Sequence, residues 1–105
     1  MNWVWTCSGE CFGYRIDDAL YTYWGLQIGH IEGDEVYGAD GKYLGDIQTG
    51  NRLVTKKGKK HQVRQGFTPA ASGSYVRTDD LSACDMDAGC EDFPTAEHFK
   101  GLFTE

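Results

Sequence analysis

The sequence predicts an all-β fold of four tandem β-hairpins over residues 1–66, arranged with pseudo-four-fold symmetry, followed by an acidic extension over residues 67–105. Composition, an internal repeat and regularly spaced turn signals each support this. The chain has 105 residues, and its 14 glycines and 14 aromatic residues against two prolines favour short strands and tight turns over long helices. A chain of this length has room for one small core.

Four segments of the chain share one design when they are aligned on their glycines. They are residues 4–13, 20–29, 36–45 and 53–62. Each has a two-residue turn signal at its middle, and these are Ser8-Gly9, Trp24-Gly25, Asp40-Gly41 and Lys57-Gly58. The turn glycines recur after 16, 16 and 17 residues. Because a type I′ turn needs positive φ at both central positions, which Asp and Gly tolerate, we expect four hairpins with two-residue turns.

These turns set the residues that face one another across each hairpin. On one face the predicted pairs are Trp5–Phe12, Tyr21–Ile28 and Tyr37–Leu44, and on the other they are Val4–Gly13, Leu20–Gly29 and Val36–Gly45. A branched residue opposite glycine usually marks the close approach of another backbone. Because a single hairpin is only marginally stable, we expect the hairpins to close around a common axis.

The repeated aromatic residue, turn glycine and apolar–Gly pair resemble the four-fold β-flower proteins, a family of small bacterial domains with four short hairpins arranged as petals. The resemblance covers residues 1–66. It implies a fold and no catalytic residues, because the family has no characterised function. The fourth copy departs from the pattern, since His61 and Gln62 replace the apolar residue and the glycine.

Charge is distributed unevenly along the chain. Residues 1–71 hold eight basic and eight acidic residues, whereas residues 72–105 hold two and eight. A near-neutral body with an acidic extension argues against nucleic-acid and anionic-membrane partners, which need a basic surface. We expect a cytoplasmic protein, because the sequence shows neither a signal-peptide pattern nor an apolar run long enough to span a membrane.

The extension from residue 67 begins with a linker-like run over 69–74 and continues as an acidic, thinly apolar segment. Such a segment often stays disordered or docks weakly, so we expect it to be mostly irregular. Phe99, Leu102 and Phe103 lie at helical spacing, which predicts a short helix docked on the body.

Four cysteines are the first candidates for chemistry, and they are Cys7, Cys11, Cys84 and Cys90. Four thiolates can hold a structural zinc ion. The second pair is separated by five residues, which is wider than usual, and the hairpin register places the first two on different faces. We therefore expect four reduced thiols and no cofactor, with structural zinc as the weaker alternative.

Tyr14, His30 and Asp46, with Val63 as the fourth member, follow the strand glycine in each repeat. In a rotationally symmetric scaffold these side chains would form a ring suited to a small ligand. A contact between His30 and Asp46 would orient the imidazole for acid–base work. The alternative is that they are polar strand residues that face solvent separately.

Trp24 occupies a turn position where the other three hairpins have polar residues, and Tyr23 and Leu26 flank it. An exposed tryptophan with aromatic neighbours indicates a contact site for a protein partner or for a second copy of the chain. The competing interpretation is that the extension folds back and covers this tip with Phe99 and Phe103.

The fourth hairpin carries a basic tip, formed by Lys56, Lys57, Lys59, Lys60 and Arg64. The alternatives to a nucleic-acid site are a solvated turn, a protected edge strand or an anchor for the acidic extension. The first two explain this tip better than nucleic-acid binding, because no aromatic residue interleaves it. The sequence contains no nucleophile motif, phosphate-binding loop or metal triad. We therefore predict a non-catalytic protein-interaction or self-association module, and as the alternative a metal-stabilised or small-ligand-binding protein.

Overall fold

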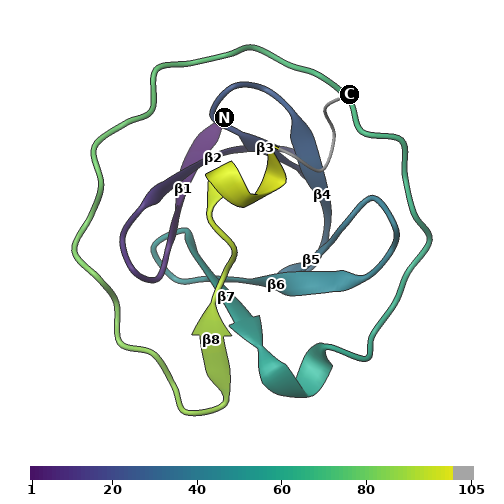
Figure 1. Cartoon of the computed structure of the whole chain (residues 1–105), viewed down its shortest axis with the longest axis vertical. Helices are drawn as coiled ribbons and strands as arrows, with labels where there is room; N and C mark the ends of the chain where they lie inside the picture. Colours follow the sequence, from purple (N-terminus) through teal and green to yellow (C-terminus); the bar gives the residue numbers. More distant parts are fainter. Residues whose placement is uncertain (101–105) are drawn as a thin grey trace.

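The computed structural model describes residues 1–100 and is all-β, as predicted, with no α-helix among those residues. Its strands are β1 (Asn2–Thr6), β2 (Cys11–Ile16), β3 (Ala19–Thr22), β4 (Gln27–Glu32), β5 (Glu35–Tyr37), β6 (Tyr43–Gln48), β7 (Arg52–Lys56) and β8 (Cys90–Asp92). Two short 3₁₀ helices complete it, η1 (Lys57–Lys59) and η2 (Ala96–Phe99). Figure 1 shows the strands as a ring.

The sheet closes on itself to form a barrel. Neighbouring strands pair in sequence order from β1 to β8, and β1 also pairs with β7. That closing pair is parallel, with Trp5 opposite Arg52 and Thr6 opposite Leu53. Seven strands therefore form the barrel, and β8 is an additional strand beside β7.

Three of the four predicted hairpins form, namely β1–β2, β3–β4 and β5–β6. The three predicted pairs of a branched residue and a glycine are confirmed, Val4–Gly13, Leu20–Gly29 and Val36–Gly45. In each turn the glycine amide donates to the carbonyl three residues earlier, and the glycine has positive φ, at Gly9 (102°), Gly25 (94°) and Gly41 (86°). This is the three-residue loop with a glycine bulge, so the predicted two-residue type I′ turn is wrong.

The bulge also shifts the register near each turn. Trp5 lies opposite Cys11, Tyr21 opposite Gln27 and Tyr37 opposite Tyr43. The predicted partners Phe12, Ile28 and Leu44 are each one residue away, because the observed loop is one residue longer than the predicted turn. A second irregularity, between Val4 and Trp5 and at the equivalent point of the other two hairpins, restores the predicted register at the branched–glycine pairs.

The fourth predicted hairpin is wrong. Lys57 and Gly58 lie in η1, and the strand that pairs with β7 is β8, with Val54 opposite Asp92. Residues after η1 leave the sheet, and Val63 instead bridges Lys42 at the turn of the third hairpin. The fourth copy lacks the apolar–glycine pair that closes the other three hairpins, which is consistent with this departure.

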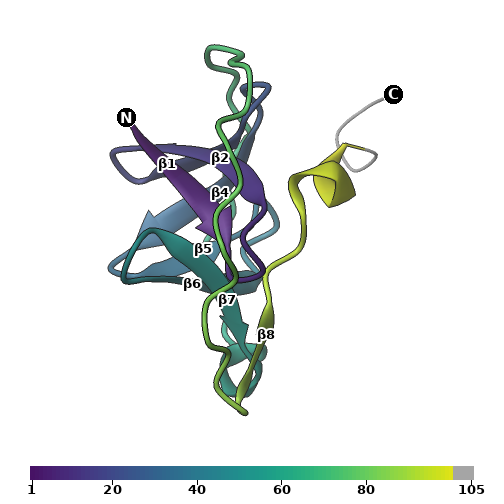
Figure 2. The same cartoon turned by 90° about the vertical axis from the view of Figure 1, so that its left-hand side faces the viewer.

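Residues 62–89, here called the belt, pass around the outside of the barrel along the hairpin turns (Figures 1 and 2). Each turn glycine accepts a belt N–H at its carbonyl, from Arg64 to Gly41 (2.7 Å), Ser72 to Gly25 (2.7 Å) and Leu81 to Gly9 (2.8 Å). The carbonyl two residues before each glycine accepts a second one, from Phe67 to Ala39, Tyr75 to Tyr23 and Cys84 to Cys7. The belt therefore binds all three turns in the same way.

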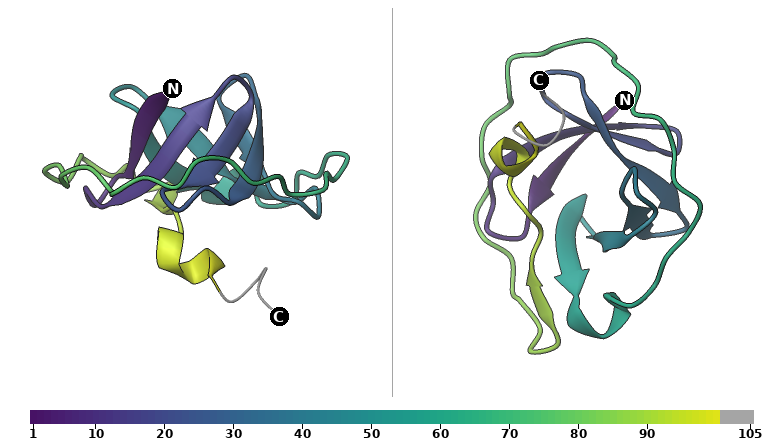
Figure 3. Two further views of the ribbon diagram at one scale, coloured as in Figure 1. Left: turned by 90° about the horizontal axis from the view of Figure 1, so that it is seen from above. Right: turned by 45° about the vertical axis from the view of Figure 1, so that its right-hand side comes forward.

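The core fills the barrel and continues into residues 93–99, here called the plug. Its buried members are Val4, Phe12, Leu20, Ile28, Ile31, Val36, Leu53, Phe93, Ala96 and Phe99. The rings of Phe12 and Phe93 meet edge to face at 5.4 Å. Figure 3 shows η2 beyond the end of the barrel where the belt lies. The predicted short helix is therefore a docked 3₁₀ turn, whereas Leu102 and Phe103 lie outside the described residues.

Candidate functional site

The turn of the second hairpin, predicted as an exposed contact site, is covered by other parts of the chain. Trp24 is partly buried and packs against the core, and the Lys100 ammonium lies 5.0 Å from its ring centroid. The Tyr23 hydroxyl donates to Glu97 at 2.8 Å, and Leu26 forms a bridge with Ala71 of the belt. The plug and the belt thus occupy much of this tip.

The predicted ring of polar residues is spread over three strands. Tyr14, His30 and Asp46 lie on β2, β4 and β6, so one strand separates each from the next along the chain, and no hydrogen bond joins them within residues 1–100. Tyr14 is buried and its hydroxyl donates to the Gly73 carbonyl at 2.6 Å. Val63 is in the belt rather than in a strand. The Tyr14 hydroxyl is thus bound by the belt, and the Asp46 carboxylate accepts from Tyr43, so both are paired with groups outside the predicted ring.

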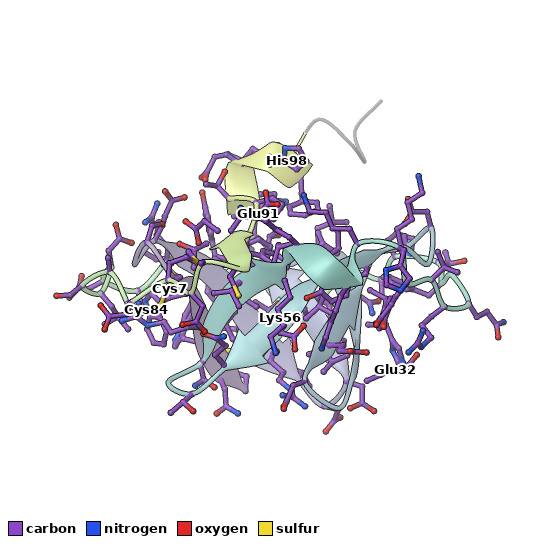
Figure 4. The ribbon with its side chains drawn as sticks, turned by 90° about the horizontal axis from the view of Figure 1, so that it is seen from below. Cys7, Glu32, Lys56, Cys84, Glu91 and His98 are labelled. Carbon is purple, nitrogen blue, oxygen red and sulfur yellow. A yellow bond between two sulfur atoms is a disulfide. The ribbon has the colours of Figure 1, made fainter. Side chains whose placement is uncertain are left out.

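The cysteines form one disulfide, between Cys7 and Cys84, with a Cα–Cα distance of 5.1 Å (Figure 4). The expectation of four reduced thiols is wrong for this pair, because the belt brings Cys84 to the first hairpin turn, which sequence spacing could not reveal. Cys11 and Cys90 are free thiols, and burial raises the pKa of Cys11. Two sulfurs bonded to each other cannot also serve in a four-cysteine zinc site, and among the described residues no His, Cys, Asp or Glu side chains are grouped to hold a metal.

The basic residues after β7 form internal ion pairs. The Lys59 ammonium lies 2.8 Å from Glu35 and 3.1 Å from Asp46. The hydrogen bond from Lys59, helped by one from Tyr37, lowers the pKa of Glu35 to about 2. Burial, with the hydrogen bond to Asp46, raises the pKa of Tyr43. Because these groups satisfy one another, their role is to fix η1 on the barrel.

A cluster of four aromatic rings, here called the aromatic wall, joins the first two hairpins to the belt. It consists of Trp3, Tyr14, Tyr21 and Tyr75. Tyr14 contacts the other three, stacked on Tyr21 at 5.2 Å and edge to face with Tyr75 at 5.1 Å. Trp3 and Tyr21 are partly buried, and Tyr75 is 44% exposed. The wall therefore presents aromatic surface to solvent.

Two aliphatic residues extend this surface. Ile16 lies two residues after Tyr14 on β2, which places it on the same face of the strand, and it is 36% exposed. Val76, next to Tyr75 in the belt, is 92% exposed. Strand pairing sets Trp3 opposite Tyr14 and Tyr14 opposite Tyr21, so the hairpin repeat could have indicated these three as neighbours. Tyr75 joins them only because the belt passes this point, which the sequence does not indicate.

A hollow of about 650 Å³ lies beside the link between β6 and β7 and reaches the belt at Cys84. Its charged lining consists of Arg15, Arg52, Lys56, Asp34, Asp46 and Asp85. The cations and carboxylates are equal in number, and Lys56 pairs with Asp46 at 3.5 Å. The hollow is thus polar and electrically balanced, and one cysteine of the disulfide lies on its lining.

Comparisons with known proteins do not assign this chain to a family. No family model matches it, and neither a curated protein nor a solved structure matches it. The resemblance to the four-fold β-flower proteins therefore stays a prediction. Within residues 1–100 no helix has the length and apolarity needed to cross a membrane.

Proposed function

We propose that this protein is a non-catalytic interaction module, and that its aromatic wall binds a second copy of the chain. The observation that carries the proposal is the cluster of four contacting rings on the outside of the barrel, three of which remain accessible. Aromatic side chains contribute strongly to protein interfaces because each removes a large apolar area from water. A side chain on the outer face of the barrel buries little apolar area in the core, so contact with a partner can bury more of its surface.

Charge favours a second copy as the occupant. The chain carries a net charge of -6, so two copies repel each other on average. The aromatic wall and its neighbours Ile16 and Val76 contain no carboxylate. Two walls related by a two-fold axis can therefore meet without burying like charges, as a self-complementary patch must.

The molar mass of the intact chain in solution tests this proposal. Light scattering over about a hundredfold range of concentration should show the mass rising from that of one chain toward two, because association depends on concentration. The double variant Tyr75→Ser, Val76→Ser removes exposed wall surface and should remain monomeric. A matched control is Leu81→Ser, Met86→Ser, which changes two belt residues of similar exposure, 41% and 40%. Wild-type protein that is monomeric throughout, or a wall variant that dimerises normally, would overturn the proposal.

The second hairpin turn offers a competing interface. Trp24, Tyr23 and Leu26 keep part of their surface accessible. The Trp24→Ala variant measured beside the wall variant separates the two sites. Loss of the dimer in Trp24→Ala together with a normal dimer in the wall variant would place the interface at this turn instead.

A second proposal concerns the fourth copy of the repeat. We propose that β7 and β8 are the fourth hairpin of the repeat, and that residues 57–89 replace its turn. The support is that β7 and β8 are antiparallel neighbours that follow three hairpins in sheet order. A variant in which Asp-Gly joins Lys56 directly to Cys90, with Cys7→Ser, should keep a cooperative unfolding transition. Loss of that transition would contradict this interpretation.

A further inference from the structure

We infer that the Cys7–Cys84 disulfide is a redox-sensitive link that controls the belt: its reduction by a dithiol releases the belt from the first hairpin turn while the barrel stays folded. The release itself is independent of the proposed function. A further consequence, loss of self-association, rests on the proposed function.

The belt is held by hydrogen bonds and by this link, without buried side chains. No side chain in residues 62–89 is buried. At the first hairpin turn, main-chain bonds from Leu81 to Gly9 and from Cys84 to Cys7 hold it, together with bonds from the Trp5 indole to the Asp79 carbonyl and from the Cys11 amide to the Asp80 carboxylate. The disulfide is the covalent tie between the belt and this turn. A segment with little apolar burial opens locally at low free energy, so removal of a covalent tie has a large effect on it.

The disulfide is placed where a reductant can reach it. Cys84 is partly buried and lines the hollow, whereas Cys7 is 1% exposed, so Cys84 is the more accessible partner of the disulfide. Arg52 also lines the hollow and donates to the Cys7 carbonyl at 3.4 Å.

The exchange proceeds in two steps. A thiolate of the dithiol attacks the Cys84 sulfur, the bond between Cys7 and Cys84 breaks, and Cys7 leaves as a thiolate that takes up a proton. The second thiol of the reductant then attacks the mixed disulfide, which frees Cys84 as a thiol. Two electrons pass to the protein, the two thiol protons of the reductant end on the two cysteines, and the dithiol becomes a cyclic disulfide.

Release of the belt alters the aromatic wall, because Tyr75 belongs to both. Tyr75 is held between the bonds at the second turn and the link at Cys84, through its own amide bond to Tyr23 and its ring contacts with Trp3 and Tyr14. Loss of the link leaves only hydrogen bonds, at Asp79, Asp80, Leu81 and Cys84, to hold this part of the belt on the first hairpin. Reduction should therefore loosen Tyr75 and weaken the surface that binds a second copy.

Amide hydrogen exchange followed by mass spectrometry tests the release, with and without dithiothreitol. Reduction should raise exchange of residues 76–84 by at least about tenfold, whereas exchange of β1 to β7 stays unchanged. The Cys84→Ser variant should exchange like reduced protein without reductant. The matched control is Cys90→Ser, which keeps the disulfide and should behave like oxidised wild type. Unchanged belt exchange after both cysteines are shown to be reduced would overturn the inference, and so would unfolding of the barrel strands.

The molar mass of the same samples separates this inference from the proposed function. A dimer that dissociates when the belt is released supports both. Wild-type protein that is monomeric in both redox states contradicts self-association, while faster belt exchange on reduction still supports the link. A dimer that persists after the belt is released overturns the proposed coupling between the link and the wall.

Discussion

The barrel and the belt are parts of one chain that are stabilised in different ways. In the barrel, side chains from six of the seven strands and from the plug are buried around a common core, and β6 adds the partly buried Leu44 and Ile47. In the belt no side chain is buried, and main-chain groups bind the hairpin turns instead. An irregular segment can therefore take a defined path without a hydrophobic core of its own. The three hairpin turns present the same main-chain groups, and the belt forms the same pair of hydrogen bonds at each turn.

Truncation inside the core should give the largest effect. Phe93 is 1% exposed and contacts the rings of Phe12 and Phe99. Phe93→Ala should lower the free energy of unfolding by about 3–5 kcal/mol, because it leaves a cavity. Val76→Ala in the belt should change it by less than about 0.5 kcal/mol. Chemical denaturation measures both, and similar losses in the two variants would contradict the distinction between barrel and belt.

An intermediate effect should arise where the two regions meet. Gly41 has a φ of +86°, and a Cβ there would lie 2.0 Å from the Arg64 carbonyl oxygen of the belt. Gly33 has a φ of +62° and nothing within 4 Å, so it shares the backbone strain without the collision. Gly41→Ala should cost about 2–4 kcal/mol and Gly33→Ala about 1 kcal/mol.

Limited proteolysis adds a second measurement for this glycine pair. Displacement of Arg64 should expose the start of the belt, so Gly41→Ala should be cleaved there faster than Gly33→Ala. Equal stability and equal cleavage in the two variants would show that the belt is not packed against Gly41.

The smallest expected change in the free energy of unfolding concerns the ion pairs that hold η1, the turn that precedes the belt. The pKa of Glu35 is about 2 in the folded protein against 4.5 ordinarily, so the unfolded chain binds a proton more readily. The stability contributed by Glu35 is therefore present above about pH 4.5 and is lost as the pH falls toward 2. Because the side chain is 22% exposed, we expect about 1 kcal/mol.

Denaturation midpoints at pH 6 and at pH 3 measure this contribution. The Glu35→Gln variant should show a weaker loss of stability between these pH values than wild type. Glu32→Gln, in the same strand pair and 44% exposed, is the control and should keep the wild-type dependence. A pH dependence in Glu35→Gln equal to that of wild type would show that Glu35 does not contribute to acid sensitivity.

Much of the barrel could be predicted from sequence because its signals are local. The pairs Val4–Gly13, Leu20–Gly29 and Val36–Gly45 follow from turn glycines at regular spacing, and all three form. The pairs one step nearer each turn, such as Trp5 opposite Cys11, could not be predicted. Two-residue and three-residue loops place glycine in the same part of the sequence, and only the glycine bulge decides between them.

The belt and the sites that depend on it could not be predicted, because they rest on distant contacts without a side-chain pattern. Main-chain bonds carry no residue preference, so residues 62–89 look like a linker. Cys84 and Tyr75 each meet partners more than 60 residues away through this path. Tyr14, His30 and Asp46 lie on β2, β4 and β6, but the bond of Tyr14 to Gly73 depends on the path of the belt and could not be predicted.

The path of the belt past the first hairpin turn is the central claim, and the pairing of the four cysteines tests it most directly. Protein made under oxidising conditions, alkylated at its free thiols and digested without reduction, should yield a linked peptide pair containing Cys7 and Cys84, with Cys11 and Cys90 alkylated. A link between Cys84 and Cys90, or alkylation of all four cysteines, would contradict this path.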